Sequence, residues 1–251
     1  MRNSHKLAAA EQTPSEPINL DSVPDEIYDT VVNAILDRAL DPGTKLPEDV
    51  FCNHYGVSRT IVRVAIHRLQ QDRLVDVQKN KGSFVVIPDH QEATDIISAR
   101  KAIEPYIVRR LVEIATDVDL AALKRHVDLE DKAYHNNDQR EALRLSGQFH
   151  ILLSKLAQNK VLEVYLQNLI CRSALVIATY SDVTGCCKAH DHRQLVELLH
   201  QRNTQDVVLQ MEHHLNDIER DLLQDRKAEE KPSLESVLMR YAGKAKIRTI
   251  S

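Results

Sequence analysis

The chain has 251 residues, of which 28% are charged and 43% hydrophobic, with 6 glycines and no tryptophan. This composition suits a folded, mostly helical protein of about two domains, and it excludes collagen-like and wholly disordered chains. The strongest apolar stretch, residues 173–180, is far shorter than the roughly 18 residues that a membrane span needs. Since the first residues show no secretory signal, we expect a cytoplasmic protein that does not engage a membrane.

Charge is distributed unevenly along the chain. The formal net charge of −4 divides into −6 for residues 1–56, +4 for 57–81, −6 for 82–225 and +4 for 226–251. A compact basic segment in an acidic protein indicates that residues 57–81 bind a polyanion, because the rest of the surface repels it. The basic tail, residues 229–251, either takes part in that binding or is a solvated end.

The first third of the chain predicts three helices. Residues 1–23 are polar and lack an apolar period, so a disordered leader is expected. Apolar residues then recur at helical spacing from Ile27 to Ala39, and Asp41-Pro42-Gly43 ends this helix with turn residues. A short second helix is predicted over residues 47–54, with Gly56 as its terminator.

A third helix and a hairpin complete the first domain. Ser58 is the expected N-cap of a helix that runs to about Gln71. Two short apolar runs, 74–77 and 83–87, flank a basic turn that contains glycine, which is the pattern of a β-hairpin. Three helices and a two-stranded wing predict a winged helix-turn-helix over residues 24–88.

The rest of the chain predicts an all-α bundle, residues 89–228. Long helical periods are interrupted by polar turns, and Glu104-Pro105 is expected to bend or break the first helix. The six predicted helices span residues 91–115, 117–135, 138–157, 161–180, 188–201 and 204–225.

Three histidines lie on three inward-facing stripes of this bundle. His150, His192 and His214 each share a helix face with apolar residues, whereas His213 shares its face with polar residues and is expected to be exposed. A single buried histidine is more often a hydrogen-bonded core residue than a ligand. Three such histidines on three helices favour a common site.

The first domain resembles the DNA-binding domain of the GntR family of bacterial transcription regulators. The resemblance rests on Pro42-Gly43, Leu46-x-Glu48, Gly56-Val57-Ser58-Arg59-Thr60, Val62-Arg63, Arg68-Leu69 and Gly82. It implies that the third helix enters the DNA major groove, with Arg59, Thr60 and Arg63 reading bases. Asp49 and Val64 depart from the family pattern, which has a basic residue and a glutamate there, so the operator sequence does not carry over.

The residues themselves support the same role for the third helix. Arg59 and Arg63 are four apart and lie side by side, and an arginine fork suits the O6 and N7 atoms of guanine. A solvated cationic face is the alternative reading of this pair. Further contacts with DNA phosphates or grooves are expected from Ser58 at the helix start, and from Lys45, Asn80 and Lys81.

The bundle resembles the FCD ligand-binding domain that follows the winged helix in FadR-type GntR regulators. The matching landmarks are Arg100-x-x-Ile103-Glu104, Phe149-His150, Gln158-Asn159, Asp191-His192 and His214-Leu215. Six helices rather than seven favour the VanR-like subgroup.

This resemblance implies a divalent metal site at His150, His192 and His214. In many FCD domains an aspartate four residues before the first histidine completes the site, and here that position is Ser146. Loss of the anionic ligand disfavours hard metals and leaves three imidazoles that suit zinc or nickel. The alternative is a metal-free pocket whose histidines bind an effector directly.

Arg100 points to the ligand of the bundle. By resemblance it faces the cavity and clamps a carboxylate, while a buried ion pair with Glu104, four residues on, is the alternative. Ser146, Asn168 and Arg172 are further candidates for effector contacts. A small organic-acid effector is therefore expected.

These features together predict a homodimeric repressor that binds a pseudo-palindromic double-stranded DNA operator and is released by its effector. Two alternatives stay open: a three-histidine metalloenzyme, and an architectural DNA-binding protein without an effector. The sequence lacks a His-Glu-x-x-His motif, a Gly-x-Ser-x-Gly turn and a glycine-rich phosphate loop, so we do not expect an enzyme.

Overall fold

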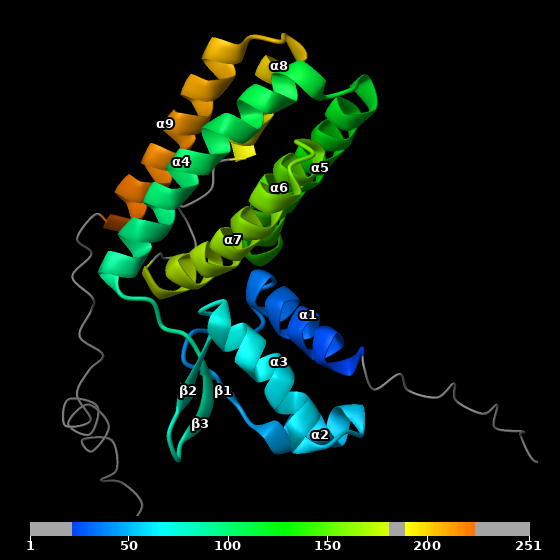
Figure 1. Ribbon diagram of the computed structural model, residues 1–251. Coiled ribbons are helices and arrows are strands. Elements are labelled where there is room, and N and C mark those ends of the chain that lie inside the picture. Colours follow the sequence, from blue (N-terminus) through cyan, green and yellow to red (C-terminus); the bar gives the residue numbers. More distant parts are fainter. Residues whose placement is uncertain (1–21, 181–188, 224–251) are drawn as a thin grey trace, which may run out of the picture.

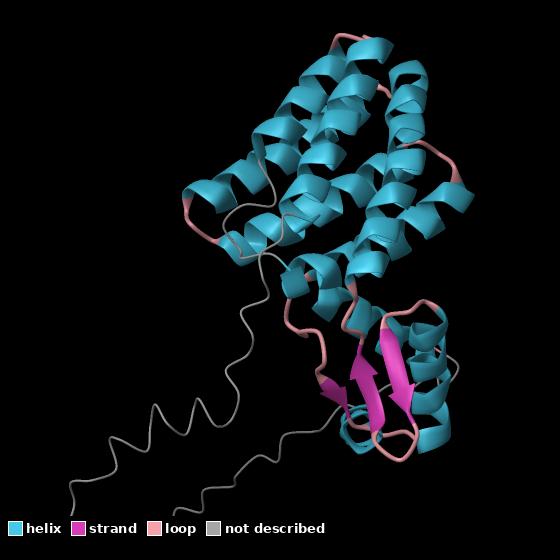
Figure 2. Ribbon diagram, turned by 90° about the vertical axis from the view of Figure 1, so that its left-hand side faces the viewer, coloured by secondary structure: helices cyan, strands magenta, loops and turns pink. Residues whose placement is uncertain are grey.

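The structure is a computed structural model, and it describes residues 22–180 and 189–223. A small domain with three strands lies below a bundle of long helices (Figures 1 and 2). The predicted leader, except for its last two residues, and the whole basic tail 229–251 lie outside the described residues. The fold is therefore mainly α, with an N-terminal winged helix followed by an all-α bundle.

The winged helix has one strand more than the sequence predicted. Strand β1 is only two residues long and pairs antiparallel with β3, Lys45 opposite Phe84 and Leu46 opposite Ser83. The predicted hairpin of β2 and β3 is confirmed, and β1 makes the sheet three-stranded with the order β1-β3-β2. The elements of this domain are α1 (Val23–Leu36), β1 (Lys45–Leu46), α2 (Glu48–Tyr55), α3 (Arg59–Gln71), β2 (Val75–Gln78) and β3 (Gly82–Val85).

Helix α1 ends earlier than its apolar pattern predicted. The last helical residue is Leu36, and Arg38 takes a left-handed conformation with φ of 51°. The amides of Ala39 and Leu40 then both donate to the carbonyl of Ala34, which closes the helix end. Ala39 therefore lies beyond the helix, and Asp41-Pro42-Gly43 is not its stop signal.

The start of α3 is organised by backbone rather than by side-chain capping. Gly56 ends α2 with φ of 67°, as expected for a residue that tolerates the left-handed region. Ser58 occupies the N-cap position of α3 in an extended conformation, but its side chain makes no capping hydrogen bond. Ser58 is exposed, so the hydroxyl that was predicted to cap the helix is accessible to solvent or to a bound molecule.

Six helices form the bundle in the described part of the chain. The N-cap carboxylate of Asp89 accepts from the amide of Glu92, and α4 then runs through Pro105 without a break. Of the two predicted outcomes the break does not occur, since the helix continues on both sides of the proline, and the bend stays a prediction. The helices are α4 (His90–Ile114), α5 (Asp117–His135), α6 (Gln139–Leu156), α7 (Lys160–Tyr180), α8 (Ala189–His200) and α9 (Thr204–Leu223).

Helix α7 is long and apolar enough to cross a membrane when length and composition alone are considered. This differs from the expectation that no segment would pass such a test. Its residues Leu166, Ile170, Leu175 and Val176 are buried in the hydrophobic core, where α7 packs against α4 and α6. Its place in the bundle thus explains part of the apolar character of α7, since 39% of the apolar window is buried.

The two domains meet along α1, α6 and α7. Helix α1 packs on α3 on one side and contacts α7 on the other (Figure 1). Arg140 of α6 donates from Nε to the carbonyl oxygen of Asp37, at 2.7 Å, just beyond the end of α1. The hydroxyl of Tyr180 donates to the carbonyl of Pro88, in the connection between the domains, at 2.8 Å. Apolar packing of α1 on α7 and these polar contacts together hold the winged helix against the bundle.

Candidate functional site

The start of α3 presents its polar face to solvent. Arg59, Thr60 and Arg63 are exposed, whereas Val62 and Ile66 on the opposite face are buried in the domain core. This division follows from the helical period, because residues three and four apart share a face. An exposed helix start with two arginines one turn apart has the form of a surface that reads a DNA groove.

Arg63 has a partner in the free protein. Its Nε lies 2.9 Å and 3.1 Å from the two carboxylate oxygens of Glu48, at the start of α2. The Arg63 side chain is 65% exposed, so the pair is screened by water and contributes little to folding. The pair holds the guanidinium in place and is readily exchanged for a base or phosphate.

The wing adds one exposed amide and two exposed cationic side chains. Asn80 has φ of 64° and Lys81 follows it, both exposed between β2 and β3. Lys45 of β1 is also exposed, and its Nζ lies 5.9 Å from the centre of the Phe84 ring on the neighbouring strand. The turn between β2 and β3 and helix α2, which leads into α3, both lie at the end of the molecule away from the bundle (Figure 1).

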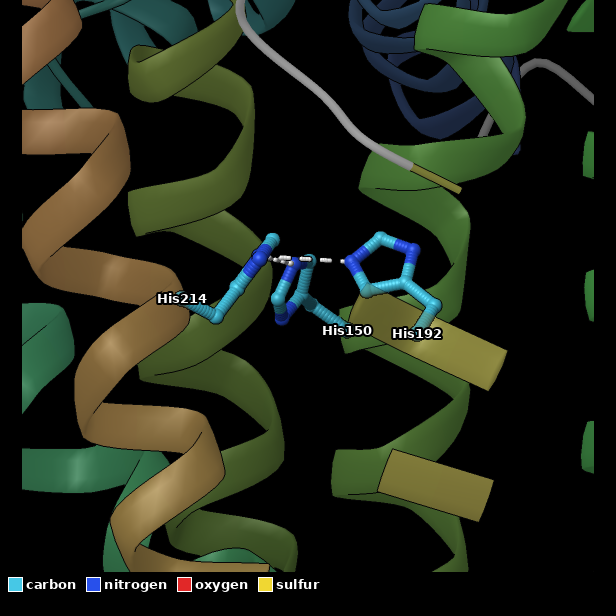
Figure 3. A group of neighbouring side chains, drawn as sticks. All are labelled: His150, His192 and His214. Atoms are coloured by element: carbon cyan, nitrogen blue, oxygen red, sulfur yellow. Dashed lines mark hydrogen bonds between the residues drawn. The ribbon is translucent and has the colours of Figure 1, made fainter. Parts of the chain in front are cut away.

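Three buried histidines converge in the bundle. Nε2 of His214 lies 3.3 Å from Nε2 of His192 and 3.3 Å from Nε2 of His150 (Figure 3). The three nitrogen atoms all lie within 4.8 Å of one another. The residues come from α6, α8 and α9, and their exposed fractions are 2%, 0% and 1% in sequence order. The predicted histidines are therefore brought together.

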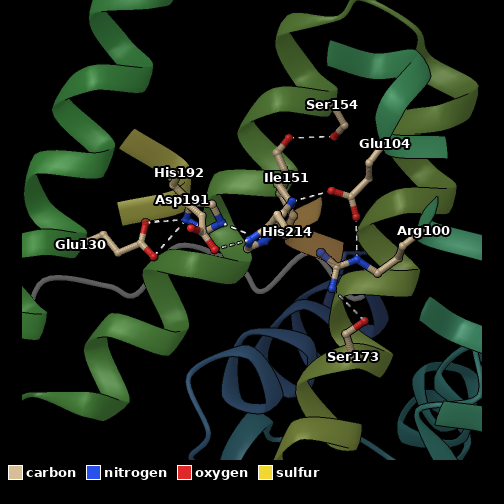
Figure 4. Close-up of polar contacts among 10 residues, drawn as sticks. Arg100, Glu104, Glu130, Ile151, Ser154, Ser173, Asp191, His192 and His214 are labelled. Carbon is tan, nitrogen blue, oxygen red and sulfur yellow. Dashed lines mark hydrogen bonds and ion pairs between the residues drawn. The ribbon is translucent and has the colours of Figure 1, made fainter. Parts of the chain in front are cut away.

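A carboxylate holds the far nitrogen of each ring. Nδ1 of His150 is 2.5 Å from Glu104, and Nδ1 of His192 is 2.8 Å from Glu130. Nδ1 of His214 is 3.4 Å from Asp191 (Figure 4). Carboxylate partners of this kind fix the orientation of metal-binding imidazoles and raise their basicity.

Electrostatics leave the inner nitrogen of His150 without a proton. Burial lowers the pKa of His150 to about 3, although the charge of Glu104 opposes this. Burial would raise the pKa of Glu104, but Arg100 and His150 hold it well below its usual range. A neutral His150 therefore donates from Nδ1 to an ionised Glu104, and its Nε2 lone pair faces the other rings.

The geometry of these lone pairs fits a cation. An imidazole that donates its Nδ1 proton to a carboxylate has only an acceptor on its inner side, and buried acceptors that face one another are costly. A tetrahedral ion with bonds of about 2.0 to 2.1 Å places its nitrogen ligands about 3.3 Å apart, as in two of the three pairs here. The cluster is thus suited to a divalent metal, with Ser146 offering a hydroxyl instead of the carboxylate of the family pattern.

A small cavity adjoins the cluster. It has a volume of about 30 Å³, and its lining includes Arg100, Ser146, His150 and Ser173. Nε of Arg100 lies 2.6 Å from Glu104, so the buried ion pair exists. The same guanidinium approaches Ser173 through Nη1 at 3.4 Å, and its buried Nη2 has no hydrogen-bond partner among the described residues (Figure 4). Arg100 therefore retains a donor for a ligand.

Asn168 and Arg172 do not line this cavity, contrary to our expectation. Asn168 donates from Nδ2 to the carbonyl of Asp72, which follows α3, at 3.0 Å. Nη2 of Arg172 lies 2.6 Å from the Glu92 carboxylate at the start of α4. Their spacing placed them on one face of α7, but that face points toward the winged helix. They connect elements of the domain junction.

Two features of the site were missed in the sequence. Glu130 continues the buried stripe Leu123 and Val127 of α5, and a glutamate on an apolar stripe is a signal of a buried partner. Ser173 and the residues that follow α1 gave no comparable signal, because their proximity to Arg100 arises only from tertiary packing.

Comparisons with known proteins agree with this architecture. The family model described as "Bacterial regulatory proteins, gntR family" matches residues 24–85, and the FCD domain model matches residues 95–217. The Uxu operon regulator of Haemophilus influenzae is 29% identical over 196 residues, which cover 70% of this chain and 73% of that protein. The galactonate operon transcriptional repressor of Escherichia coli is 27% identical over 160 residues, which cover 55% of this chain and 69% of that protein.

A solved structure is similar over both domains. The crystal structure of a GntR transcriptional regulator from Rhodococcus sp. RHA1 aligns with a TM-score of 0.71 and 25% identity. The alignment covers 80% of this chain and 98% of that one. The similarity extends across the winged helix and the bundle together.

Proposed function

The chain belongs to the GntR family of bacterial regulatory proteins and carries an FCD domain, and from this premise we propose that it is a repressor released by a small carboxylate. It is a DNA-binding transcription regulator. We place its winged helix at residues 24–88 and its bundle at 89–228, which the two matched ranges support. The compartment we propose is the cytoplasm, and the subgroup is VanR-like on the basis of six bundle helices.

The DNA reader in this proposal is the start of α3. The exposure of Arg59, Thr60 and Arg63 opposite a buried apolar face is the observation that carries it. Ser58 at the helix N-terminus and Lys45, Asn80 and Lys81 in the wing contact phosphates or the adjacent groove. Two copies read a pseudo-palindrome, since a symmetric dimer presents two recognition helices to two half-sites.

Selection from a random DNA library with the full chain tests this part. The selected duplex is expected to contain two related half-sites, and two chains are expected to bind each duplex. A selected sequence without symmetry, bound by a single chain, would remove the dimer from the proposal. If no consensus sequence is recovered, the proposal that α3 reads the base sequence is wrong.

The effector proposal rests on Arg100. Its buried Nη2 lacks a hydrogen-bond partner among the described residues and belongs to the lining of the cavity, where a carboxylate oxygen would satisfy it. Galactonate, in the name of one relative, is itself a carboxylate, and that relative is a repressor. A thermal-shift series with carboxylate salts, followed by release of the selected duplex, tests the effector; if no carboxylate changes either quantity, the effector is of another class.

A divalent metal, zinc or nickel, is proposed at His150, His192 and His214. When bound, such an ion supplies a Lewis-acidic position that holds an anionic ligand or water. Metal content of the wild type is expected near one ion per chain, and His192→Ala is expected to lose it. His213→Ala is the matched control, because that ring is 65% exposed and neighbours His214 in sequence. Equal metal content in both variants would contradict the assignment.

A further inference from the structure

The wall of the cavity beside Arg100 comes from both domains. Most lining residues belong to bundle helices, but Leu36 and Arg38 come from the end of α1 and the residues just after it, in the winged helix. Leu36 is 8% exposed, and Nη2 of Arg38 is buried. The DNA-binding domain therefore forms part of the surface that a bundle ligand would touch.

The charge of this wall favours an anion. Arg38, Arg100 and Arg144 line the cavity, and no aspartate or glutamate is among the lining residues in the described part of the chain. Guanidinium groups bind carboxylates through parallel hydrogen bonds, and low polarity around them strengthens the attraction. Arg100 and Arg144 are already paired with Glu104 and Glu141, so a carboxylate inside the cavity would use their remaining donors together with Arg38 of the other domain.

The size of the cavity adds a mechanical constraint. A volume of about 30 Å³ holds roughly two water molecules, so an organic acid with several carbon atoms must displace part of the wall. On the bundle side that wall is made of helices packed in the core, and Leu36 of α1 belongs to the same core. Asp37, the residue after α1, is held by surface contacts. Arg140 donates to the Asp37 carbonyl at 2.7 Å, and Arg144 lies 3.7 Å from the Asp37 carboxylate.

Breaking exposed polar contacts costs less free energy than separating packed helices. The Asp37 side chain is 47% exposed, and exposed ion pairs contribute little to stability. Replacing the contacts that involve Asp37 costs less than opening the core between α4, α6 and α7. The contacts of Asp37, between Leu36 and Arg38, are therefore the ones in this segment that a ligand replaces at the least cost.

We propose that Arg38 binds the effector carboxylate together with Arg100, so that the effector contacts the winged helix directly and shifts the end of α1. This inference rests on the proposed effector pocket and adds the route by which the pocket controls DNA binding. The effector does not act only through the connection between the domains. It changes the contacts of α6 with Asp37, the residue after α1, and α1 packs on the recognition helix α3.

Binding measurements on the full chain test this inference. Sodium acetate, pyruvate, citrate, galactonate and benzoate are compared at constant ionic strength, and the salt that raises the wild-type melting temperature most is the probe. Its dissociation constant is then measured by calorimetry. Arg38→Met and Arg100→Met are each expected to weaken binding at least about tenfold, the effect of losing a hydrogen bond to a charged group. The probe should also release the selected DNA duplex from wild type and not from Arg38→Met.

Arg140→Met is the matched control. It removes an arginine contact between α6 and the residue after α1 without changing the cavity lining, and it should bind the probe as wild type does. If Arg140→Met loses as much affinity as Arg38→Met, docking of the domains explains the effect and the inference is wrong. Arg38→Lys keeps the charge but not the fork, and it should fall between wild type and Arg38→Met.

The outcomes separate this inference from the effector proposal. Wild-type binding by Arg38→Met, with loss in Arg100→Met, would overturn the role of Arg38 and leave the pocket in place. Should Arg38→Met fail to fold, wild-type binding by Arg38→Lys has the same meaning. A probe series that never stabilises the wild type would overturn both.

Discussion

The proposed DNA-reading surface and the histidine cluster of this chain are built in opposite ways. Arg59, Thr60 and Arg63 are exposed on a helix whose other face forms the core. His150, His192 and His214 are buried, and each ring is held by a carboxylate from another residue. The reading surface can therefore change without loss of the fold, whereas the cluster forms part of the fold.

This contrast predicts where substitutions affect stability. The buried groups form a connected chain, from Arg100 through Glu104 to His150, in which each charge is satisfied by its neighbour. Removing one member leaves another buried and unpaired, and that cost appears in the free energy of unfolding. Exposed arginines have no such neighbour effect, since water replaces what is lost.

The largest effect is expected for Arg100→Met. It leaves the buried Glu104 without its cation, and the free energy of unfolding should fall by about 3 to 5 kcal/mol. Urea unfolding checks this, with Arg59→Met as the control, which should stay within about 0.5 kcal/mol of wild type. Equal free energies of unfolding for the two variants would contradict the expected difference between the buried groups of the bundle and the exposed face of α3.

Glu130→Gln sharpens the contrast within the bundle. It keeps the size of the side chain but weakens the hold on Nδ1 of His192, so zinc affinity should fall by about 10- to 100-fold. Competition with a chelator of known affinity measures this. Glu212→Gln, an exposed residue on α9, should bind zinc as wild type does. If both variants match wild type, the carboxylates do not support a metal.

Arg59→Ala addresses the reading surface. Loss of one two-pronged contact with guanine costs about 1 to 2 kcal/mol, so affinity for the selected duplex should fall about tenfold with no change in unfolding. Anisotropy titrations measure it, and Arg109→Ala in the bundle is the control. Unchanged affinity after Arg59→Ala would show that this residue does not read a base.

The smallest effect is expected for Lys81→Ala in the wing. A phosphate contact carries no sequence information, so binding to selected and scrambled duplexes should weaken alike. The slope of log affinity against log salt should decrease by about one. A loss confined to the selected duplex would instead place Lys81 in a base-reading role.

Local sequence patterns sufficed for the helices of the bundle, because their buried stripes repeat at helical spacing. Strand β1 could not be predicted, since a two-residue strand has no period and forms only because β3 lies beside it. The three histidines were expected to meet, and they do. Their carboxylates and the approach of Arg38 depend on how α5, α8 and α1 pack, which spacing within one helix does not reveal.

For Asn168 and Arg172, too, the neighbouring elements could not be predicted from the sequence. Their spacing of four correctly predicted a shared face of α7. Spacing within one helix does not show which other element that face contacts. They contact Asp72 and Glu92 and join elements that meet between the domains. Motif-bearing positions on the surface of α3 were easier to assign, because an exposed face needs no neighbour to be identified.

The ratio of affinities for two duplexes tests the central claim, that the exposed face of α3 reads DNA sequence. Anisotropy at about 0.15 M salt compares the selected duplex with a scrambled duplex of equal length and composition. The wild type is expected to prefer the selected duplex by at least about 10³-fold, and the double substitution Arg59→Ala with Arg63→Ala is expected to abolish most of this preference. Equal affinity of the wild type for both duplexes would contradict it.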